Sequence, residues 1–297
     1  ELIESAVSRH SSNWGLLRQA AKSYQQLQHS GFLLDGEFRR GYHRGGGSYV
    51  ECMGRDRVRS IQLVRRAIET VDENSAGVIS DLYSELAGYL AMGRTGVQRV
   101  WALGVLTNLV ELPDHGDEGR LSSGSGAPVD TKGGALVFEV PESWESAKND
   151  GERWRWATNE SVRLAPEKEP QAKEQWARFL VQHYGVGTLA GFGRWMQQDP
   201  EEAEAVLQVH TLKETETIAK LASGVQRFDL APDYQFIPLL RRLSTGKQSN
   251  AGLGDQLVQV LLNRRQYAAG ARELKRLIAT HGRGKGNHRQ SLLGQIE

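Results

Sequence analysis

A pair of apolar stripes near the C-terminus constrains the fold more than any other feature of this chain. Residues 257–278 read LVQVLLNRRQYAAGARELKRLI, in which apolar and small residues recur at helical spacing on both sides of a short polar turn at residues 263–266. This layout is typical of a tetratricopeptide-type helix hairpin. We expect Tyr267 to pack at the corner, and these residues to face inward: Leu257, Val260, Leu261, Gly270, Leu274 and Leu277. Because such a hairpin cannot bury its apolar face alone, the sequence predicts stacked neighbouring helices and an interaction surface.

Similar stripes predict helices along most of the chain. One pair is expected at residues 12–28 and 57–68, and a second at residues 83–90 and 97–109. The two pairs are separated by far more than the ~34 residues of a tetratricopeptide unit, so the repeats are degenerate or decorated. Further helices are expected at residues 144–148, 151–162, 170–184, 200–209, 213–223 and 235–243, and from about residue 288. Since no element demands a large sheet, the predicted class is all-α.

Two long stretches interrupt these helices. Residues 31–55 include Gly41 and three consecutive glycines at 45–47, and residues 114–134 are rich in Gly, Ser and Asp. The segment ALVFEV at residues 135–140 predicts one short strand with little nearby to pair it. The predicted architecture is therefore an irregular α-solenoid of tetratricopeptide-like hairpins with long loop insertions. We expect a helical unit at residues 1–112 with its insertion at 31–55, an irregular linker at 113–143, and a second helical unit at 144–297 that ends in the hairpin 257–278.

Composition gives no preference for a polyanionic partner. The 297 residues include 37 basic and 36 acidic ones, so no overall charge draws the chain toward nucleic acid or a membrane surface. No apolar run approaches the ~20 residues of a membrane span. The single cysteine, Cys52, excludes an internal disulfide framework and a cysteine-rich metal site. The chain begins at Glu1 without a methionine, and we expect it to be a segment of a longer polypeptide.

A glycine-rich basic segment is the best candidate for binding. Residues 39–48 read RRGYHRGGGS, and the backbone amides of such a loop could hold an anion. The segment lacks the Lys-Ser/Thr ending of a P-loop, and no strong strand precedes it, so we favour an insertion that is flexible or packs against a partner. Its candidate partner-binding residues are Arg39, Arg40, Tyr42, His43 and Arg44. A second basic loop at residues 282–289 is expected to be a solvated connector.

The sequence predicts no reaction chemistry. The histidines form neither His-x-x-x-His nor His-Glu-x-x-His, so no zinc site is expected. No Gly-x-Ser-x-Gly elbow occurs, and Cys52 lies beside no evident base in the sequence. We therefore expect Cys52 to be a partly buried, small apolar residue. Trp154 and Trp156 could stack on nucleic-acid bases, but their spacing turns them to different helix faces and favours packing. No catalytic residue, cofactor or metal ligand is therefore assigned, and we expect that the protein is not an enzyme.

Several phrases of the sequence together resemble a known family. They are RGYHRGGGSYV with RDRVRSIQLV (residues 40–50 and 55–64), GAPVD (126–130), KNDGERWRW (148–156), HTLKETETIAKLASGVQRF (210–228) and LLNRRQYAAGARELKRLI (261–278). In this order they resemble the N-terminal, helical-repeat region of large bacterial alpha-2-macroglobulin-like proteins. In such proteins the helical region precedes β-domains and, in many members, a thioester domain with the motif Cys-Gly-Glu-Gln, which this sequence does not contain. The resemblance implies a periplasmic or extracytoplasmic location and assigns this chain the part of a scaffold.

Three functions follow from these observations. The leading expectation is a non-catalytic helical scaffold that docks other domains of the same polypeptide, envelope proteins or proteases, with no nucleic acid and no membrane span. The alternative is a free-standing tetratricopeptide-type adaptor that binds peptide segments of partner proteins. A third is an enzyme that uses the basic glycine-rich loop on a phosphorylated or acidic substrate, for which His43 is the only nearby candidate base.

Overall fold

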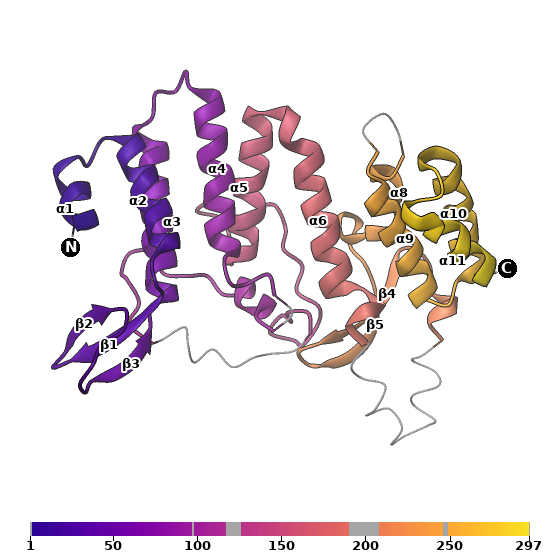
Figure 1. The fold of residues 1–297 in the computed structure, drawn as a ribbon, viewed down its shortest axis with the longest axis horizontal. Helices are drawn as coiled ribbons and strands as arrows, with labels where there is room; N and C mark the ends of the chain where they lie inside the picture. Colours follow the sequence, from indigo (N-terminus) through magenta and orange to yellow (C-terminus); the bar gives the residue numbers. More distant parts are fainter. Residues whose placement is uncertain (1, 97, 117–125, 190–207, 246–248, 297) are drawn as a thin grey trace. The chain divides into compact units, whose positions relative to one another are not determined.

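The chain is mainly helical and forms two compact units. The computed structural model describes residues 2–96, 98–116, 126–189, 208–245 and 249–296. Residues 1–124 and 138–169 belong to unit 1, and residues 125–137 and 170–297 belong to unit 2 (Figure 1). Each unit combines helices with one small sheet, so the predicted class all-α is wrong in its strict form and holds only as mainly α.

Unit 1 is built from helices that pack against their neighbours in sequence. Its elements are α1 (Leu2–Arg9), α2 (Trp14–Gln26), α3 (Met53–Thr70), α4 (Ala76–Ala91), η1 (Val100–Gly104), α5 (Asp150–Leu164) and η2 (Pro166–Lys168). Asn13 caps α2 by accepting a hydrogen bond from the Leu16 amide at 3.0 Å. The pair predicted from residues 12–28 and 57–68 is confirmed as α2 and α3, which bury Leu17 and Ile61 completely.

The insertion at residues 31–55 holds a three-stranded antiparallel sheet that the sequence analysis did not predict. Strands β1 (Ser30–Leu34), β2 (Glu37–Arg40) and β3 (Ser48–Glu51) are arranged in the order β2-β1-β3. A two-residue turn joins β1 to β2, and Asp35 and Gly36 have positive φ angles of 50° and 85°. Asp-Gly favours this turn, because both residues tolerate the left-handed conformation that its twist requires.

Unit 2 combines a β-hairpin with the C-terminal helices. Its elements are α6 (Glu169–Tyr184), η3 (Val186–Leu189), η5 (Val209–Thr211), β4 (Glu216–Leu221), β5 (Gly224–Asp229), η6 (Pro232–Tyr234), α8 (Phe236–Leu243), α9 (Ala251–Asn263), α10 (Tyr267–His281), η7 (Lys285–Asn287) and α11 (His288–Ile296). Ala127 forms a bridge to Leu221 beside β4, which brings residues 125–137 into this unit. The core includes Tyr184, Ile218, Leu257 and Leu277, each 0% exposed.

The hairpin predicted at residues 257–278 is confirmed as the helix pair α9 and α10. All the residues expected to face inward are buried, and Leu274 and Leu277 pack with Val258 and Leu293 of α11. The two helices approach closely at Gly254, where a β-carbon would lie 2.2 Å from Leu277 Cδ2. One detail is wrong: Tyr267 does not pack at the corner but is 53% exposed.

The helix predicted at residues 213–223 is wrong, because this segment forms β4 and its turn. Thr217, Ile218, Ala219 and Leu221 are all buried, as expected for a strand covered on both sides. Buried residues therefore lie on both faces of the strand, and their period does not distinguish a buried strand from a buried helix.

The helix predicted at residues 97–109 shortens to η1 in the described part of this range. The chain after η1 is extended, because its backbone bonds to the start of α5: Asp150 N donates to Val105 O at 3.0 Å, and Thr107 N donates to Asp150 Oδ1 at 3.1 Å. Residues 144–148 form turns, in which Ser143 and Ser146 bond to each other's backbone amides instead of continuing a helix.

The structure also differs from the expected strand at residues 135–140 and from the expected placement of α5. The strand expected at residues 135–140 reduces to a single bridge between Val129 and Ala135. The helix expected at residues 200–209 lies mostly outside the described residues. Helix α5, expected in the unit that begins at residue 144, packs against α4 in unit 1, where Ser161 Oγ donates to Ser80 O at 2.8 Å.

Candidate protein-interaction site

The three-stranded sheet of unit 1 presents two faces of different character. Paired residues on neighbouring strands share a face. Phe32 pairs with both Arg39 and Tyr49, so these side chains lie on one face, whereas Phe38 and Arg40 lie on the other. We call the face that carries Phe32, Arg39 and Tyr49 the outer face, and the face that carries Phe38 and Arg40 the inner face.

The inner face is anchored by a buried ion pair. The Arg40 guanidinium donates to both oxygens of the Asp56 carboxylate, from Nη1 to Oδ2 at 2.7 Å and from Nη2 to Oδ1 at 2.8 Å. Arg40 Nη1 also donates to the Gln28 carbonyl at 2.7 Å. Burial opposes the charge on Arg40, but Asp56, which is 1% exposed, outweighs it and raises the pKa of the guanidinium. Arg40 therefore joins β2 to the first turn of α3.

A stacked aromatic pair holds the same face. The ring of Phe38 lies on the imidazole of His115, with centroids 4.2 Å apart and planes inclined by 24°. Burial lowers the pKa of His115, and the nearby Arg55 and Arg40 lower it further. His115 is therefore neutral near pH 7, as its packing against an apolar ring requires.

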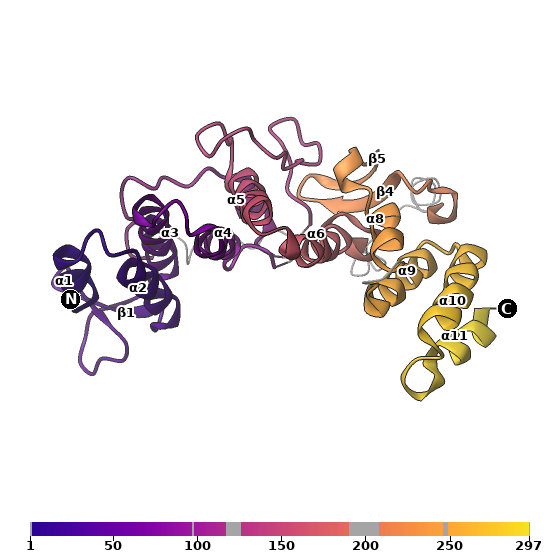
Figure 2. The same cartoon turned by 90° about the horizontal axis from the view of Figure 1, so that it is seen from above.

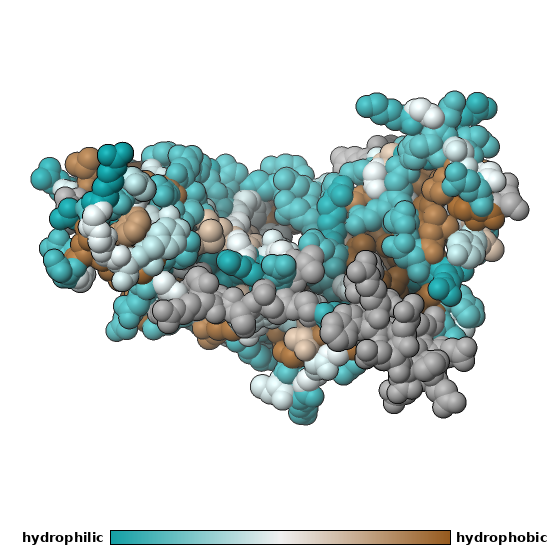
Figure 3. All heavy atoms as spheres, turned by 60° about the horizontal axis from the view of Figure 1, so that its bottom comes forward, coloured by the Kyte–Doolittle hydropathy of each residue, from teal (hydrophilic) through white to brown (hydrophobic). Residues whose placement is uncertain are grey.

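The outer face is rich in exposed aromatic residues. The Phe32 ring contacts Tyr49 edge to face at 5.7 Å and His43 at 6.2 Å between centroids. Tyr49 is 58% exposed, and Tyr42, in the connection that follows β2, is 81% exposed. Figure 3, in which hydrophobic residues are brown and hydrophilic ones teal, shows hydrophobic residues at several places on the surface of the protein. Exposed aromatic side chains next to cations are typical of protein-binding surfaces.

The structure separates the five candidate residues into two groups. Arg40 is occupied by Asp56 and Gln28 on the inner face. Arg39 and Arg44 are exposed, and among the described residues neither side chain has a hydrogen-bond or ion-pair partner. Tyr42, His43 and Arg44 lie in the connection between β2 and β3, whereas Arg39 lies in β2. The candidate site therefore consists of Arg39, Tyr42, His43 and Arg44, together with Phe32 and Tyr49, which sequence reasoning missed.

Cys52 has the surroundings of an inert thiol. It is 2% exposed, and burial together with the negative charge of Asp56 raises its pKa to about 12. Arg40 Nη1 lies 3.1 Å from its sulfur, and Asp56 Oδ2 lies 3.5 Å from it. The nearby histidine, His29, directs its Nδ1 at Asp56 Oδ2, 2.8 Å away, and not at the sulfur. The thiol is therefore protonated at neutral pH, and the carboxylate beside it, Asp56, is already bound by Arg40.

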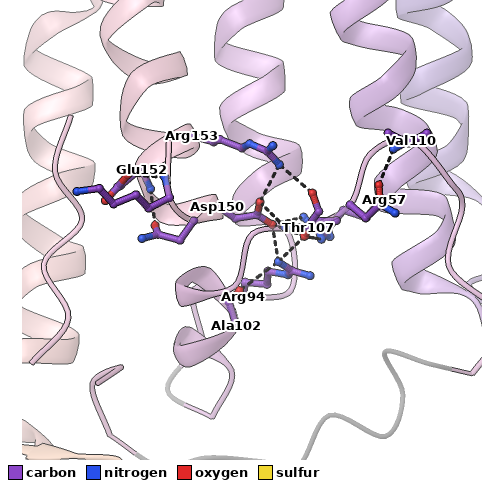
Figure 4. Close-up of polar contacts among 11 residues, drawn as sticks. Arg57, Arg94, Ala102, Thr107, Val110, Asp150, Glu152 and Arg153 are labelled. Atoms are coloured by element: carbon purple, nitrogen blue, oxygen red, sulfur yellow. Dashed lines mark hydrogen bonds and ion pairs between the residues drawn. The ribbon is translucent and has the colours of Figure 1, made fainter. Parts of the chain in front are cut away.

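A second polar cluster in unit 1 is buried around Asp150 (Figure 4). The Asp150 carboxylate is 0% exposed and lies 2.6 Å from Arg94 Nη1 and 3.4 Å from both Arg57 Nη1 and Arg153 Nη1. Thr107 donates its hydroxyl to the same carboxylate, and it accepts from Arg57 Nη2 at 2.8 Å. The cluster thus joins α3, α5 and the extended chain after η1. Its members come from distant parts of the sequence, so no local sequence motif predicts the cluster.

The Asp150 cluster is structural in character. A buried carboxylate of this kind needs several cationic partners to offset its desolvation, and the three arginines supply them. A pocket opens beside Thr107, and it is lined by Val58, Thr107, Asn108, Glu111, Leu112, Pro113 and Asp114. Arg57, Arg94 and Arg153 are not among the lining residues, so their charges are directed at Asp150 and not into the pocket.

Other features suggested by the sequence have structural roles. Trp156 contacts Tyr83 edge to face at 5.5 Å and Trp144 at 5.9 Å, and Trp154 packs against the same core. The packing interpretation of both tryptophans is therefore confirmed. In the described ranges, no group of His, Cys, Asp and Glu side chains is arranged to hold a metal ion. Of the helices described, none combines the length and apolar character that crossing a membrane requires.

Comparisons with known proteins leave the family open. No protein-family model matches this chain, and neither a curated protein nor a solved structure matches it. The resemblance to alpha-2-macroglobulin-like proteins therefore rests on the sequence phrases alone and stays a prediction.

Proposed function

We propose that this chain is a non-catalytic helical scaffold that docks other protein domains or chains. The observation that carries the proposal is the outer face of the three-stranded sheet, where Tyr49 and Arg39 are exposed, together with exposed Tyr42 and Arg44 in the connection that follows β2. Neither arginine side chain has a polar partner among the described residues. Aromatic and arginine side chains contribute most to the energy of protein interfaces. The face is carried on strands that the Arg40–Asp56 pair fixes to α3, so little conformational entropy is lost when a partner binds.

The proposed architecture is an irregular α-solenoid of tetratricopeptide-like hairpins. Within unit 1, α2 contacts α3, α3 contacts α4, and α4 contacts α5. Within unit 2, α8 contacts α9, α9 contacts α10, and α10 contacts α11. Packing between successive helices is the pattern expected of stacked repeats, which use their extended surfaces for binding.

The proposed setting is a large alpha-2-macroglobulin-like protein of the bacterial cell envelope. The phrases RGYHRGGGSYV and LLNRRQYAAGARELKRLI support it. The partners would be other domains of the same polypeptide, or envelope proteins and proteases. The protonated, buried Cys52 supports a non-catalytic role for the sheet region.

A photocrosslinking experiment tests this proposal. A photoreactive phenylalanine analogue replaces Tyr42 in the protein in its native cell, and crosslinked peptides are identified by mass spectrometry. We expect crosslinks to other domains of the same polypeptide, and a loss of most of them when Arg39 and Arg44 are also changed to glutamate. The same analogue at Glu73, which is exposed in the turn between α3 and α4, serves as the control.

The outcomes separate the scaffold from the alternatives. Crosslinks from position 42 to peptides of different proteins would favour the free-standing adaptor, for which the outward-facing aromatic side chains are equally suited. Crosslinking at position 42 no stronger than at position 73 would contradict both, because the sheet would then be ordinary solvated surface.

A further inference from the structure

Charge is strongly segregated toward the C-terminal helices of unit 2. From Phe236 to Ile296 the sequence has eleven Lys and Arg residues and only two acidic ones, Asp255 and Glu273, although the whole chain has a net charge of +1. The remainder of the chain is therefore net acidic. Segregation of this degree creates a local positive potential that the overall balance conceals.

Both acidic residues are already used within the unit. Glu273 accepts from Arg241 Nε at 2.6 Å and from Arg276 Nε at 2.7 Å. Asp255 binds Arg289 through both oxygens, at 2.7 and 2.8 Å. Neither carboxylate contacts the exposed cations Arg265, Arg272, Arg283 and Lys285, and none of these four side chains has a polar partner in the part of the chain that the structure describes.

These cations follow the length of α10. The helix buries Gly270, Leu274 and Leu277 against α9 and α11, which lie beside it in Figure 2. The opposite side carries exposed residues at i, i+3 and i+4 spacing, namely Ala268, Arg272, Lys275 and Ala279. Arg265 precedes the helix, and Arg283 and Lys285 follow it, so the cations cover roughly 22 Å of helix length. We call Arg265, Arg272, Lys275, Arg283 and Lys285 the basic face.

Internal stabilisation does not account for the basic face. Cations after a helix C-terminus interact favourably with the helix dipole, which explains Arg283 and Lys285 in part. Arg265 lies between the C-terminus of α9, whose dipole favours a cation, and the N-terminus of α10, whose dipole disfavours one. Arg272 lies in the middle of α10, where neither dipole end is near. The small side chains of Ala268 and Ala279 leave the neighbouring cations accessible to a partner.

We propose that the basic face of α10 binds an acidic segment of a partner protein. This inference rests on the proposed scaffold function and specifies one class of its partners. A short acidic segment can contact the basic face alone, whereas a long polyanion would also meet the net acidic remainder of the chain. Tyr267 is the one large aromatic side chain exposed in the described part of α8–α11, so the platform of stacked aromatics used for single-stranded nucleic acid is not present there. Arginine matches carboxylates with its planar fork of donors.

A titration with a short fluorescein-labelled polyglutamate peptide tests the proposal. The full chain is added at low salt, and fluorescence anisotropy reports the dissociation constant. Arg265→Glu and Arg272→Glu should each weaken binding by about five- to tenfold, and Arg272→Lys, which keeps the charge but loses the planar fork, should weaken it less. Raising the salt concentration should weaken wild-type binding, since the contacts are charged. Arg66→Glu, the same charge change at an exposed position of α3 in unit 1, is the matched control and should bind like the wild type.

Each other outcome would overturn the proposal. Unchanged binding by Arg272→Glu, or an equal loss in Arg66→Glu, would show that the peptide responds to general charge and not to the basic face. Tighter binding of a DNA duplex or of vesicles containing phosphatidylserine, with the same dependence on Arg272, would make the site one for nucleic acid or for a membrane. Circular dichroism of each variant verifies that the helices are intact. Crosslinking at position 42 does not depend on these residues, so the scaffold proposal can stand or fall separately.

Discussion

Arg39 and Arg40 are adjacent in sequence but have opposite surroundings. Strand alternation points Arg40 at the buried Asp56 and leaves Arg39 exposed on the outer face of the sheet. Asp56 is 1% exposed and His29 is its other ion-pair partner, so the carboxylate depends on Arg40 for most of its compensation. A guanidinium and a carboxylate held in this bidentate geometry also fix the angle between β2 and α3.

Replacing Arg40 by alanine should therefore destabilise the protein far more than replacing Arg39. Arg40→Ala leaves a buried carboxylate without its bidentate partner, and the expected cost is about 2–4 kcal/mol in the free energy of unfolding. Arg39→Ala should change it by less than about 0.5 kcal/mol, because its side chain has no partner to lose. Urea denaturation of both variants measures the difference. Equal stabilities would mean that the Arg40–Asp56 pair does not hold the sheet.

Sequence reasoning grouped the candidate residues in one segment but could not assign them to the faces of a sheet. The prediction grouped Arg39, Arg40, Tyr42, His43 and Arg44 because they are consecutive polar and aromatic residues in a glycine-rich stretch. Separating Arg40 from Arg39 needs the strands and their register, and the signal for these was the Asp35-Gly36 turn. The Asp150 cluster could not be found in this way, because Arg57, Arg94 and Asp150 meet only in the folded chain.

At the scale of elements, the α9–α10 helix hairpin shows which of its residues contribute most to stability. Leu274 and Leu277 are 1% and 0% exposed, so changing either to alanine should lower the free energy of unfolding by about 2–5 kcal/mol through lost burial and an unfilled cavity. Tyr267→Ala, at a residue that is 53% exposed in the same helix, should have little effect. Thermal unfolding followed by circular dichroism compares the three variants. An unchanged melting temperature in both leucine variants would contradict the assignment of these residues to the core.

The ion pairs of Glu273 link α10 to α8 and predict a dependence on pH. Burial raises the pKa of Glu273, but Arg241 and Arg276 together outweigh it and lower the pKa below 4.5. Because the folded state holds the carboxylate more strongly than the unfolded state, its contribution is present above pH 4.5 and is lost as the pH falls through the lowered pKa. Glu273→Gln should thus cost about 1–3 kcal/mol near pH 7 and less at about pH 3.

Urea denaturation of wild type and Glu273→Gln at both pH values measures this difference. Glu145→Gln provides the control, since the Glu145 side chain is 76% exposed and its ion pair with Arg65 is long, at 3.9 Å. A cost for Glu273→Gln that stays constant with pH would mean that its charge does not stabilise the helix pair.

The predicted elements differ from the observed ones where burial is complete. Helices α2, α6 and α10 were predicted because each has one apolar and one polar face, which sets a visible period. Strand β4 has no such period, because its buried residues Thr217, Ile218 and Leu221 are distributed over both faces of the strand. Its neighbours in the sheet are β5 and Ala127, and a contact with Ala127 cannot be anticipated from local sequence. Long-range pairing therefore makes this segment a strand, which the periodicity of its sequence could not predict.

At the scale of the whole molecule, each unit has a hydrophobic core of its own. Leu17, Ile61 and Leu86 belong to a cluster made entirely of unit 1 residues, and Val258, Leu274 and Leu277 belong to one made of unit 2 residues. A linker was expected at residues 113–143 because much of this stretch is rich in Gly, Ser and Asp. In the structure, the residues of this stretch are instead divided between the two units. Ala127 pairs with Leu221 in unit 2, and Phe138 packs on Gly151 in unit 1.

Separate cores predict that damage to one unit stays within that unit. Leu86→Ala in unit 1 and Leu277→Ala in unit 2 form a matched pair, since both side chains are at most 1% exposed. Each removes the same atoms from a packed core, so the local cost should be similar, about 2–5 kcal/mol. Residues without shared contacts respond independently, and native-state opening follows the local core. Hydrogen exchange measured by mass spectrometry should thus accelerate in α2–α5 for Leu86→Ala and in α8–α11 for Leu277→Ala. Faster exchange throughout the chain in both variants would instead mean that the two cores unfold as one cooperative unit.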